Sequence, residues 1–272
     1  MHFFDPHIHV ASRTTNDIEA LARAGCLAVG EPAFWMGYDR SGVACFCDYF
    51  RQLTEWEPRR TATYGIRHYV WVGMNSKEAE NVALAREVIA LLPEFLDKPD
   101  VLGIGEIGLN KCTKNEVATL LELVELAMQR DEQLLFHTPH LEEKYRGTRM
   151  ILDMLRADRR VDHDRVWIDH CEEHTIRLVL DEGYWAGLTL YPTTKMTPER
   201  AIDMIEIYGP ERILVTSSAD WGPSDPMAVP TFILAMRRRG HPTSLIRRIV
   251  YENPLALMNQ SRSFQFTPLD RS

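Results

Sequence analysis

Eight short apolar runs, separated by longer segments with helical spacing, constrain the fold of this chain more than any other feature. The runs cover residues 3–9, 26–32, 67–74, 101–108, 133–139, 166–171, 185–191 and 213–219. Between them, apolar residues recur at helical intervals, as over 77–96 and 115–130. Nearly continuous apolar strands that alternate with helices are typical of parallel βα units, whose strands are buried on both faces. The pattern therefore predicts an α/β fold, with a closed (β/α)8 TIM barrel as its simplest form and a doubly wound open sheet as the alternative.

The length of 272 residues suits one barrel, and no linker or low-complexity tract divides the chain. We therefore expect a single domain over residues 1–260. Residues 261–272 show no clear periodicity, so we expect them to form a loose C-terminal tail.

The charge balance and the cysteines exclude some classes of protein. The net charge of -8 disfavours broad nucleic-acid binding, which relies on clustered Lys and Arg. The densest basic spots, 237–239 and 247–248, are expected to be a solvated helix face. Five cysteines without a CxxC pair indicate a reducing compartment. Because no secretory signal and no apolar run of about 18 residues occurs, we expect a cytoplasmic protein without a membrane span.

Titratable residues recur at the ends of the predicted strands. They are His7 and His9 on the first strand, Glu106 on the fourth, His137 on the fifth, His170 on the sixth and Asp220 after the eighth. In a parallel barrel all strand C-termini meet at one face, and residues at i and i+2 of a strand point to the same side. A single histidine of this kind is more often structural than a ligand. Imidazole and carboxylate together are ligands for zinc and similar ions, so the conjunction predicts a metal site.

The motifs around these residues resemble those of a known family. They are DPHIHV (5–10), GEIGLN (105–110), FHTPH (136–140), WIDHC (167–171) and the aspartate of SSADWG (217–222). In order and spacing they are similar to the metal-binding motifs of TatD-related hydrolases, a branch of the amidohydrolase superfamily. The resemblance runs from about residue 3 to 259 and includes ENPLAL (252–257).

This resemblance implies a hydrolase with one or two divalent ions per chain, zinc first, with manganese or magnesium as alternatives. It implies that His7, His9 and Asp220 hold one ion, that His137 and His170 hold the second, and that Glu106 bridges them. A metal-bound water would be the nucleophile, and Asp220 would also act as its general base. The chain departs from the family in two places. Ser218 stands two residues before Asp220, where an acid is usual, and Glu172 follows the sixth strand, where small residues are usual.

Four residues near the expected mouth of the barrel are candidates for substrate binding: His140, Glu172, Trp35 and Trp221. His140 could equally be a loop residue, and Glu172 could instead be a charge at a helix start. Trp35 belongs to a long aromatic-rich stretch, 31–50, that would roof the cavity or simply cover a helix. Cationic residues near the strand ends are sparse, with Lys111, Arg146 and Lys195 as the nearest.

These features favour hydrolysis of a small-molecule amide, lactone or ester. An apolar mouth in an acidic protein suits an organic small molecule better than a nucleic-acid backbone. The alternative is a TatD-type metal-dependent nuclease or phosphoesterase, which the charge disfavours. A decarboxylase of the same superfamily is disfavoured by the resemblance around Glu106. A binding protein that kept only the barrel is disfavoured by the complete set of expected ligands.

Overall fold

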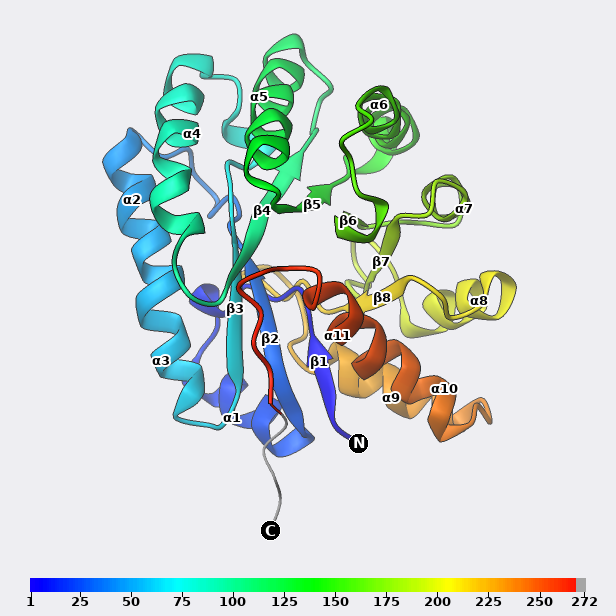
Figure 1. The fold of residues 1–272 in the computed structure, drawn as a ribbon. Helices are drawn as coiled ribbons and strands as arrows, with labels where there is room; N and C mark the ends of the chain where they lie inside the picture. The colour runs from blue at the N-terminus through cyan, green and yellow to red at the C-terminus, as the bar shows by residue number, and fades with distance from the viewer. Residues whose placement is uncertain (268–272) are drawn as a thin grey trace.

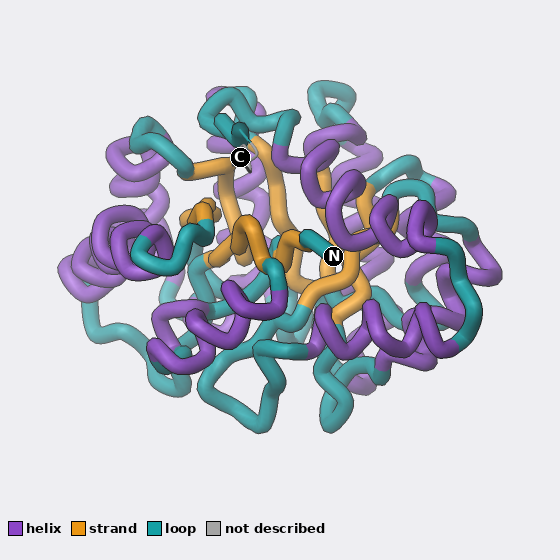
Figure 2. Tube along the Cα trace, turned by 90° about the horizontal axis from the view of Figure 1, so that it is seen from below, coloured by secondary structure: helices purple, strands orange, loops and turns teal. Residues whose placement is uncertain are grey.

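The computed structural model describes residues 1–267 and contains eight parallel strands that pair in sequence order, from β1 to β8 (Figure 1). The strands are β1 Phe3–Asp5, β2 Cys26–Pro32, β3 Arg67–Val72, β4 Val101–Gly108, β5 Gln133–His137, β6 Val166–Asp169, β7 Trp185–Thr189 and β8 Ile213–Thr216. Seen from below, the strands lie inside a ring of helices (Figure 2). The predicted α/β barrel is confirmed.

The barrel closes through residues that follow β1 and β8, since no strand ladder joins these two strands within residues 1–267. The Ser218 amide donates to the His7 carbonyl oxygen at 2.7 Å, and the His9 amide donates to the Ala219 carbonyl oxygen at 2.9 Å. The closure therefore lies at the C-terminal ends of the strands, where the candidate site residues are.

Helices follow the strands and cover the outside of the barrel (Figure 1). The α-helices are α1 Thr15–Ala24, α2 Val43–Arg51, α3 Glu57–Ala62, α4 Val82–Leu96, α5 Lys114–Arg130, α6 Lys144–Ala157, α7 Ile176–Asp181, α8 Pro198–Tyr208, α9 Ala228–Arg238, α10 Thr243–Arg247 and α11 Asn253–Met258. The helix predicted over 115–130 agrees with α5. The one predicted over 77–96 begins later, because the Asn81 side chain caps α4 by accepting the Leu84 amide at 3.1 Å.

Strands β2 and β4 have the predicted bounds, whereas the other six strands end two or more residues earlier than predicted. Pro6 follows β1 and has no amide hydrogen for a ladder. His170 and Ser218 follow β6 and β8 with φ of 59° and 43°, a left-handed conformation that ends an extended strand. His7, His9 and His170 therefore lie in the turns just beyond the strands, not on them.

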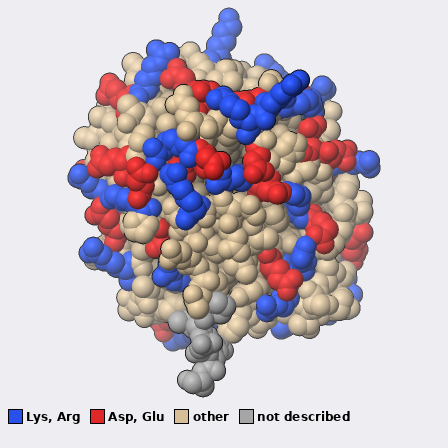
Figure 3. Space-filling view, viewed as in Figure 1, with Lys and Arg blue, Asp and Glu red and all other residues tan. Residues whose placement is uncertain are grey.

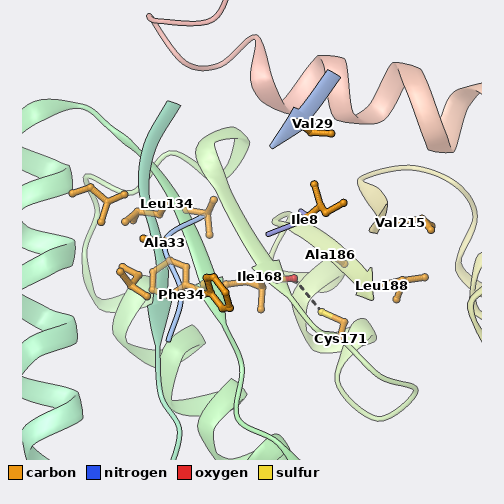
Figure 4. Packing of buried hydrophobic residues seen from close by; sticks show 14 of the residues in the cluster. Ile8, Val29, Ala33, Phe34, Leu134, Ile168, Cys171, Ala186, Leu188 and Val215 are labelled. Atoms are coloured by element: carbon orange, nitrogen blue, oxygen red, sulfur yellow. Dashed lines mark hydrogen bonds between the residues drawn. The ribbon is translucent and has the colours of Figure 1, made fainter. Parts of the chain in front are cut away.

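Alternating side chains fill the two sides of the sheet. Along β3, Tyr69 and Trp71 belong to an inner cluster, while Val70 and Val72 belong to an outer cluster shared with the helices. The inner cluster also contains Phe4, Leu102, Leu135, Trp167 and Leu214. Figure 4 shows part of the outer cluster, with Leu134 and Ile168 from neighbouring strands. Because large side chains fill the barrel interior, space for a ligand remains only at its ends.

Residues 261–267, the described part of the segment expected to be a loose tail, pack against the barrel. Phe264 is 9% exposed, and its ring centroid lies 4.7 Å from that of Tyr69. Phe266 meets Phe4 edge-on at 4.8 Å, and the Tyr69 hydroxyl donates to the Gln265 carbonyl oxygen at 2.9 Å. The expectation is wrong here because these rings cover apolar side chains at the N-terminal end of the barrel. Residues 268–272 lie outside the described residues.

Most of the charged surface in Figure 3 shows Lys and Arg next to Asp and Glu. The basic spots noted in the sequence follow this pattern: Arg239 pairs with Asp203, and Arg248 pairs with Glu211. These pairs agree with a solvated helix face. Within residues 1–267, no helix is long and apolar enough to cross a membrane.

Phe264→Ala should lower the free energy of unfolding by about 3 kcal/mol, because it removes a buried ring from the N-terminal end of the barrel. The measurement is urea unfolding followed by circular dichroism. Leu234→Ala is the control, because Leu234 is 45% exposed on α9 and its truncation should change stability by less than about 0.5 kcal/mol. Equal changes in the free energy of unfolding for the two substitutions would show that Phe264 does not pack against the N-terminal end of the barrel.

Candidate metal centre

A bulge in β4 positions Glu106. The pairing of β4 with β5 shifts register between Ile104 and Ile107, so two residues of β4 face one residue of β5. The backbone at Gly105 approaches β5 so closely that a Cβ there would lie 2.6 Å from the Cβ of Leu135. Glycine permits this approach, and the bulge brings the Glu106 carboxylate against histidines from the ends of β5 and β6.

Glu106 is buried between two imidazoles. Its Oε1 lies 2.7 Å from His137 Nδ1 and 3.0 Å from His170 Nε2. Burial alone would raise the pKa of the Glu106 carboxyl, but the charge of His137 and hydrogen bonds from both histidines hold this pKa well below its usual range. The site therefore keeps a buried carboxylate in its charged form.

The two histidines after β1 present nitrogen atoms to one another. His7 Nε2 and His9 Nε2 are 3.1 Å apart, and His7 Nδ1 donates to Asp169 Oδ2 at 2.5 Å. Because Nδ1 carries the proton in that bond, Nε2 of a neutral His7 is left as an acceptor. The His9 ring stacks on Phe34, with centroids 3.7 Å apart, and its Nδ1 is buried without a hydrogen-bond partner among the described residues.

Asp169 is a site residue that the sequence reasoning missed. Its Oδ2 accepts from His7, and its Oδ1 accepts from the Thr189 hydroxyl at 3.2 Å. Thr189 Oγ1 in turn lies 2.7 Å from His170 Nδ1. A Cβ at Gly187 would lie 2.0 Å from Asp169 Oδ1, so a glycine on β7 leaves room for this carboxylate. An acid inside the apolar β6 was the available signal, the same signal that identified Glu106.

Three overlapping groups of buried side chains could hold a cation. They are His7 with His9 and Glu106; His7 with Asp169 and His170; and Glu106 with His137 and His170. Within each group, one ligand atom per residue lies within 4.8 Å of the others. Imidazole nitrogens and carboxylate oxygens in this arrangement fit a divalent ion of the zinc type. The Asp169 carboxylate, which bonds to His7 directly and to His170 through Thr189, would orient those two histidines.

Asp220 lies apart from these groups. Its Oδ1 accepts from the Gly222 amide at 2.8 Å and from the Tyr191 hydroxyl at 3.1 Å. The residue after β8 that touches the cluster is Ser218, whose Oγ lies 3.4 Å from His7 Nε2. The structure thus brings together five of the six residues predicted as ligands, and it places Asp220 at the wall of the pocket above them.

A pocket of about 820 Å³ opens above the cluster. Three of the four predicted substrate contacts line it: His140, Trp35 and Trp221. Glu172 does not, because its Oε1 faces the buried Lys144 ammonium at 3.8 Å. The wall also includes Lys77, Tyr191 and Lys195, of which only Lys195 was noted in the sequence as a nearby cation.

Asp169→Asn should weaken metal binding by about tenfold to a hundredfold, because the amide cannot accept from His7 and Thr189 as a carboxylate does. The measurement is zinc affinity by competition with a chromogenic chelator. Asp181→Asn, at an exposed position at the end of α7, is the matched control. Unchanged affinity in Asp169→Asn would show that this carboxylate does not orient the histidines.

Comparison with known proteins agrees with this geometry. Residues 4–256 match the family model described as TatD related DNase. An uncharacterized metal-dependent hydrolase of Methanocaldococcus jannaschii is 30% identical over 254 residues, which cover 92% of this chain and 96% of that protein. The crystal structure of a TatD-like protein from Archaeoglobus fulgidus has a TM-score of 0.77 at 26% identity, covering 94% of this chain and 99% of that one.

A mutant organophosphorus hydrolase from Deinococcus radiodurans has a TM-score of 0.66 at 14% identity, covering 94% of this chain and 92% of that one, and so shares the fold alone. The family match spans nearly the whole length of the chain, and the histidine–carboxylate cluster is a candidate donor set for a metal ion. The chain therefore belongs to the TatD-related family and is a metal-dependent hydrolase.

Proposed function

We propose that this hydrolase cleaves a small-molecule amide, lactone or ester, using a divalent ion held by His7, His9, Glu106, His137 and His170. The observation that carries the proposal is the convergence of these five buried side chains beneath a pocket of about 820 Å³. A pocket of this size suits a small organic molecule. Hydrolysis of a nucleic acid is the second candidate, because the matching family model is described by a DNase activity.

Zinc is the proposed ion, at one or two per chain, with manganese or magnesium as alternatives, because four of the five proposed ligands are imidazoles. A bound ion of this kind supplies Lewis acidity and an activated water at neutral pH. The residues around it set the geometry. Asp169 holds His7, Thr189 holds His170, and Glu106 contributes the negative charge between His137 and His170.

Asp220 is proposed as the general base that accepts a proton from the attacking water. Its Oδ1 is held by the Gly222 amide and the Tyr191 hydroxyl, while its Oδ2 makes no hydrogen bond within residues 1–267. The Asp220 backbone is fixed as well, because Arg13 Nη1 donates to its carbonyl oxygen at 2.7 Å. A carboxylate anchored through one oxygen leaves the other for proton transfer in the pocket.

The first test is metal content together with a substrate panel. We expect the metal-loaded protein to hydrolyse at least one amide, lactone or ester faster than single- or double-stranded DNA. His7→Ala combined with His9→Ala should abolish metal binding and hydrolysis while the circular dichroism spectrum stays that of a folded barrel. Wild-type metal content in the double variant would refute the site assignment, and faster cleavage of DNA would favour the second candidate.

Asp220→Asn should keep the metal content of the wild type but reduce kcat by about a hundredfold or more, because the amide cannot accept the proton. Elemental analysis and steady-state kinetics measure the two quantities on the same preparation. Asp225→Asn, in the exposed turn before α9, is the matched control and should have wild-type kcat. A kcat of Asp220→Asn near that of the wild type would remove Asp220 from the mechanism.

A further inference from the structure

Two lysines in the pocket wall form no ion pair among the described residues. Lys77 follows β3 and Lys195 follows β7, and both line the pocket that contains Glu106 and the histidines. Within residues 1–267, neither ammonium group makes a hydrogen bond or an ion pair. The other two cations expected near the strand ends, Lys111 and Arg146, are absent from the lining. The pocket thus holds two uncommitted positive charges close to the proposed metal ligands.

Lys77 is exposed, and its ammonium lies over an aromatic ring. Its Nζ lies 4.3 Å from the centroid of the Trp35 ring, which is a cation–π contact. Its backbone belongs to a short 3-10 turn, Ser76–Glu78, in which the Asn75 side chain accepts the Lys77 amide at 3.1 Å. The turn and the ring together keep the ammonium at the pocket.

The backbone of Lys195 is held by Arg200, which also forms an ion pair with Glu173. Arg200 Nη1 donates to the Lys195 carbonyl oxygen at 2.6 Å, and the same guanidinium binds both carboxylate oxygens of Glu173 at 2.7 and 2.6 Å. The Lys195 amide donates to the Tyr191 carbonyl oxygen at 2.7 Å, and its Nζ lies 5.1 Å from the Tyr191 ring centroid. Through this ion pair with Arg200, Glu173 helps to fix the loop that carries Lys195.

The surroundings of Lys195 favour an additional anion. Burial lowers the pKa of this ammonium, and the nearby carboxylates of Glu106, Asp169 and Asp220 only partly oppose that effect. A divalent ion held by Glu106 would engage one of these three charges. The Lys195 side chain is partly exposed, and a partly buried cation is stabilised when an anion is paired with it.

The same mouth offers flat apolar surface. The rings of Trp35 and Trp221 lie 6.4 Å apart at an angle of 59°, and Trp221 is 55% exposed. The exposed indole of Trp221 and the partly exposed indole of Trp35 suit a planar apolar group, which can stack on an aromatic ring. Cations and aromatic rings therefore occupy one mouth, above the proposed metal ligands.

We propose that the pocket binds a small organic anion, with a carboxylate or phosphate group held by Lys77 and Lys195 and a planar apolar part packed on Trp35 and Trp221. This inference names the substrate class of the hydrolase and rests on the proposed function. A small molecule fits better than a nucleic-acid strand, because the chain carries a net charge of -8 and the surface in Figure 3 intersperses basic with acidic residues.

The test measures the binding of defined probes to the zinc-loaded full-length chain. Tryptophan fluorescence reports the binding, because Trp35 and Trp221 line the pocket. The probes are benzoate and phenyl phosphate, with neutral benzamide as their uncharged analogue. We expect at least one anion to bind more tightly than benzamide. Lys77→Met and Lys195→Met should each weaken its binding about tenfold or more, because each removes a charge-assisted hydrogen bond. The affinity for benzamide should not change.

Two controls separate charge from structure. Lys195→Arg should retain anion affinity within about threefold, because it keeps a long cation at the same place. Lys111→Met removes an exposed lysine outside the pocket and should leave every affinity unchanged. Zinc content is measured in each variant, so that loss of anion binding is not confused with loss of metal.

The outcomes distinguish this inference from the proposed function. Anion binding that depends on the lysines in a chain that holds no metal would support the inference and refute the proposed function. Wild-type anion affinity in both methionine variants would overturn the inference, whatever the metal content. Binding that depends on the lysines for a single-stranded oligonucleotide, but for neither aryl anion, would overturn the small-molecule assignment in favour of a nucleic acid.

Discussion

The buried carboxylate of Glu106 is the constraint on which the site depends. A charged carboxylate removed from water is stable only when donors or cations surround it, and here His137 and His170 contact the same oxygen. To place it there, β4 needs a bulge and a glycine at 105 that lets the strand approach β5. A buried cluster rich in imidazole and carboxylate is suited to hold a cation.

A second layer of polar contacts makes the cluster rigid. Asp169 connects to His7 directly and to His170 through Thr189, so one buried carboxylate orients two imidazoles. Lys144 adds a backbone contact, because its buried ammonium donates to the His170 carbonyl oxygen at 2.8 Å. Such outer contacts hold ligand atoms in position before a ligand arrives, which lowers the ordering cost of binding.

The proposed metal ligands and the residues that would select a substrate lie in different parts of the barrel. The proposed ligands lie at or just beyond strand ends, on a scaffold whose interior is filled by large rings such as Trp71 and Trp167. The residues that would select a substrate lie in the longer connections: Trp35 after β2, Lys77 after β3, Lys195 after β7 and Trp221 after β8. Members of one hydrolase family can thus share a metal site and act on different molecules.

The sequence by itself determined the βα repeat and most of the cluster. A titratable residue that interrupts an apolar strand, such as Glu106 or His137, is a local signal and needs no knowledge of the rest of the chain. Only the tertiary structure decided that Ser218 lies against His7 while Asp220 stands apart, and that residues 264–266 cover the N-terminal end of the barrel. Beyond a strand, the direction of a side chain depends on left-handed turns and on hydrogen bonds across the closure, such as that from Ser218 to His7. These contacts join residues about two hundred positions apart, and no local pattern encodes them.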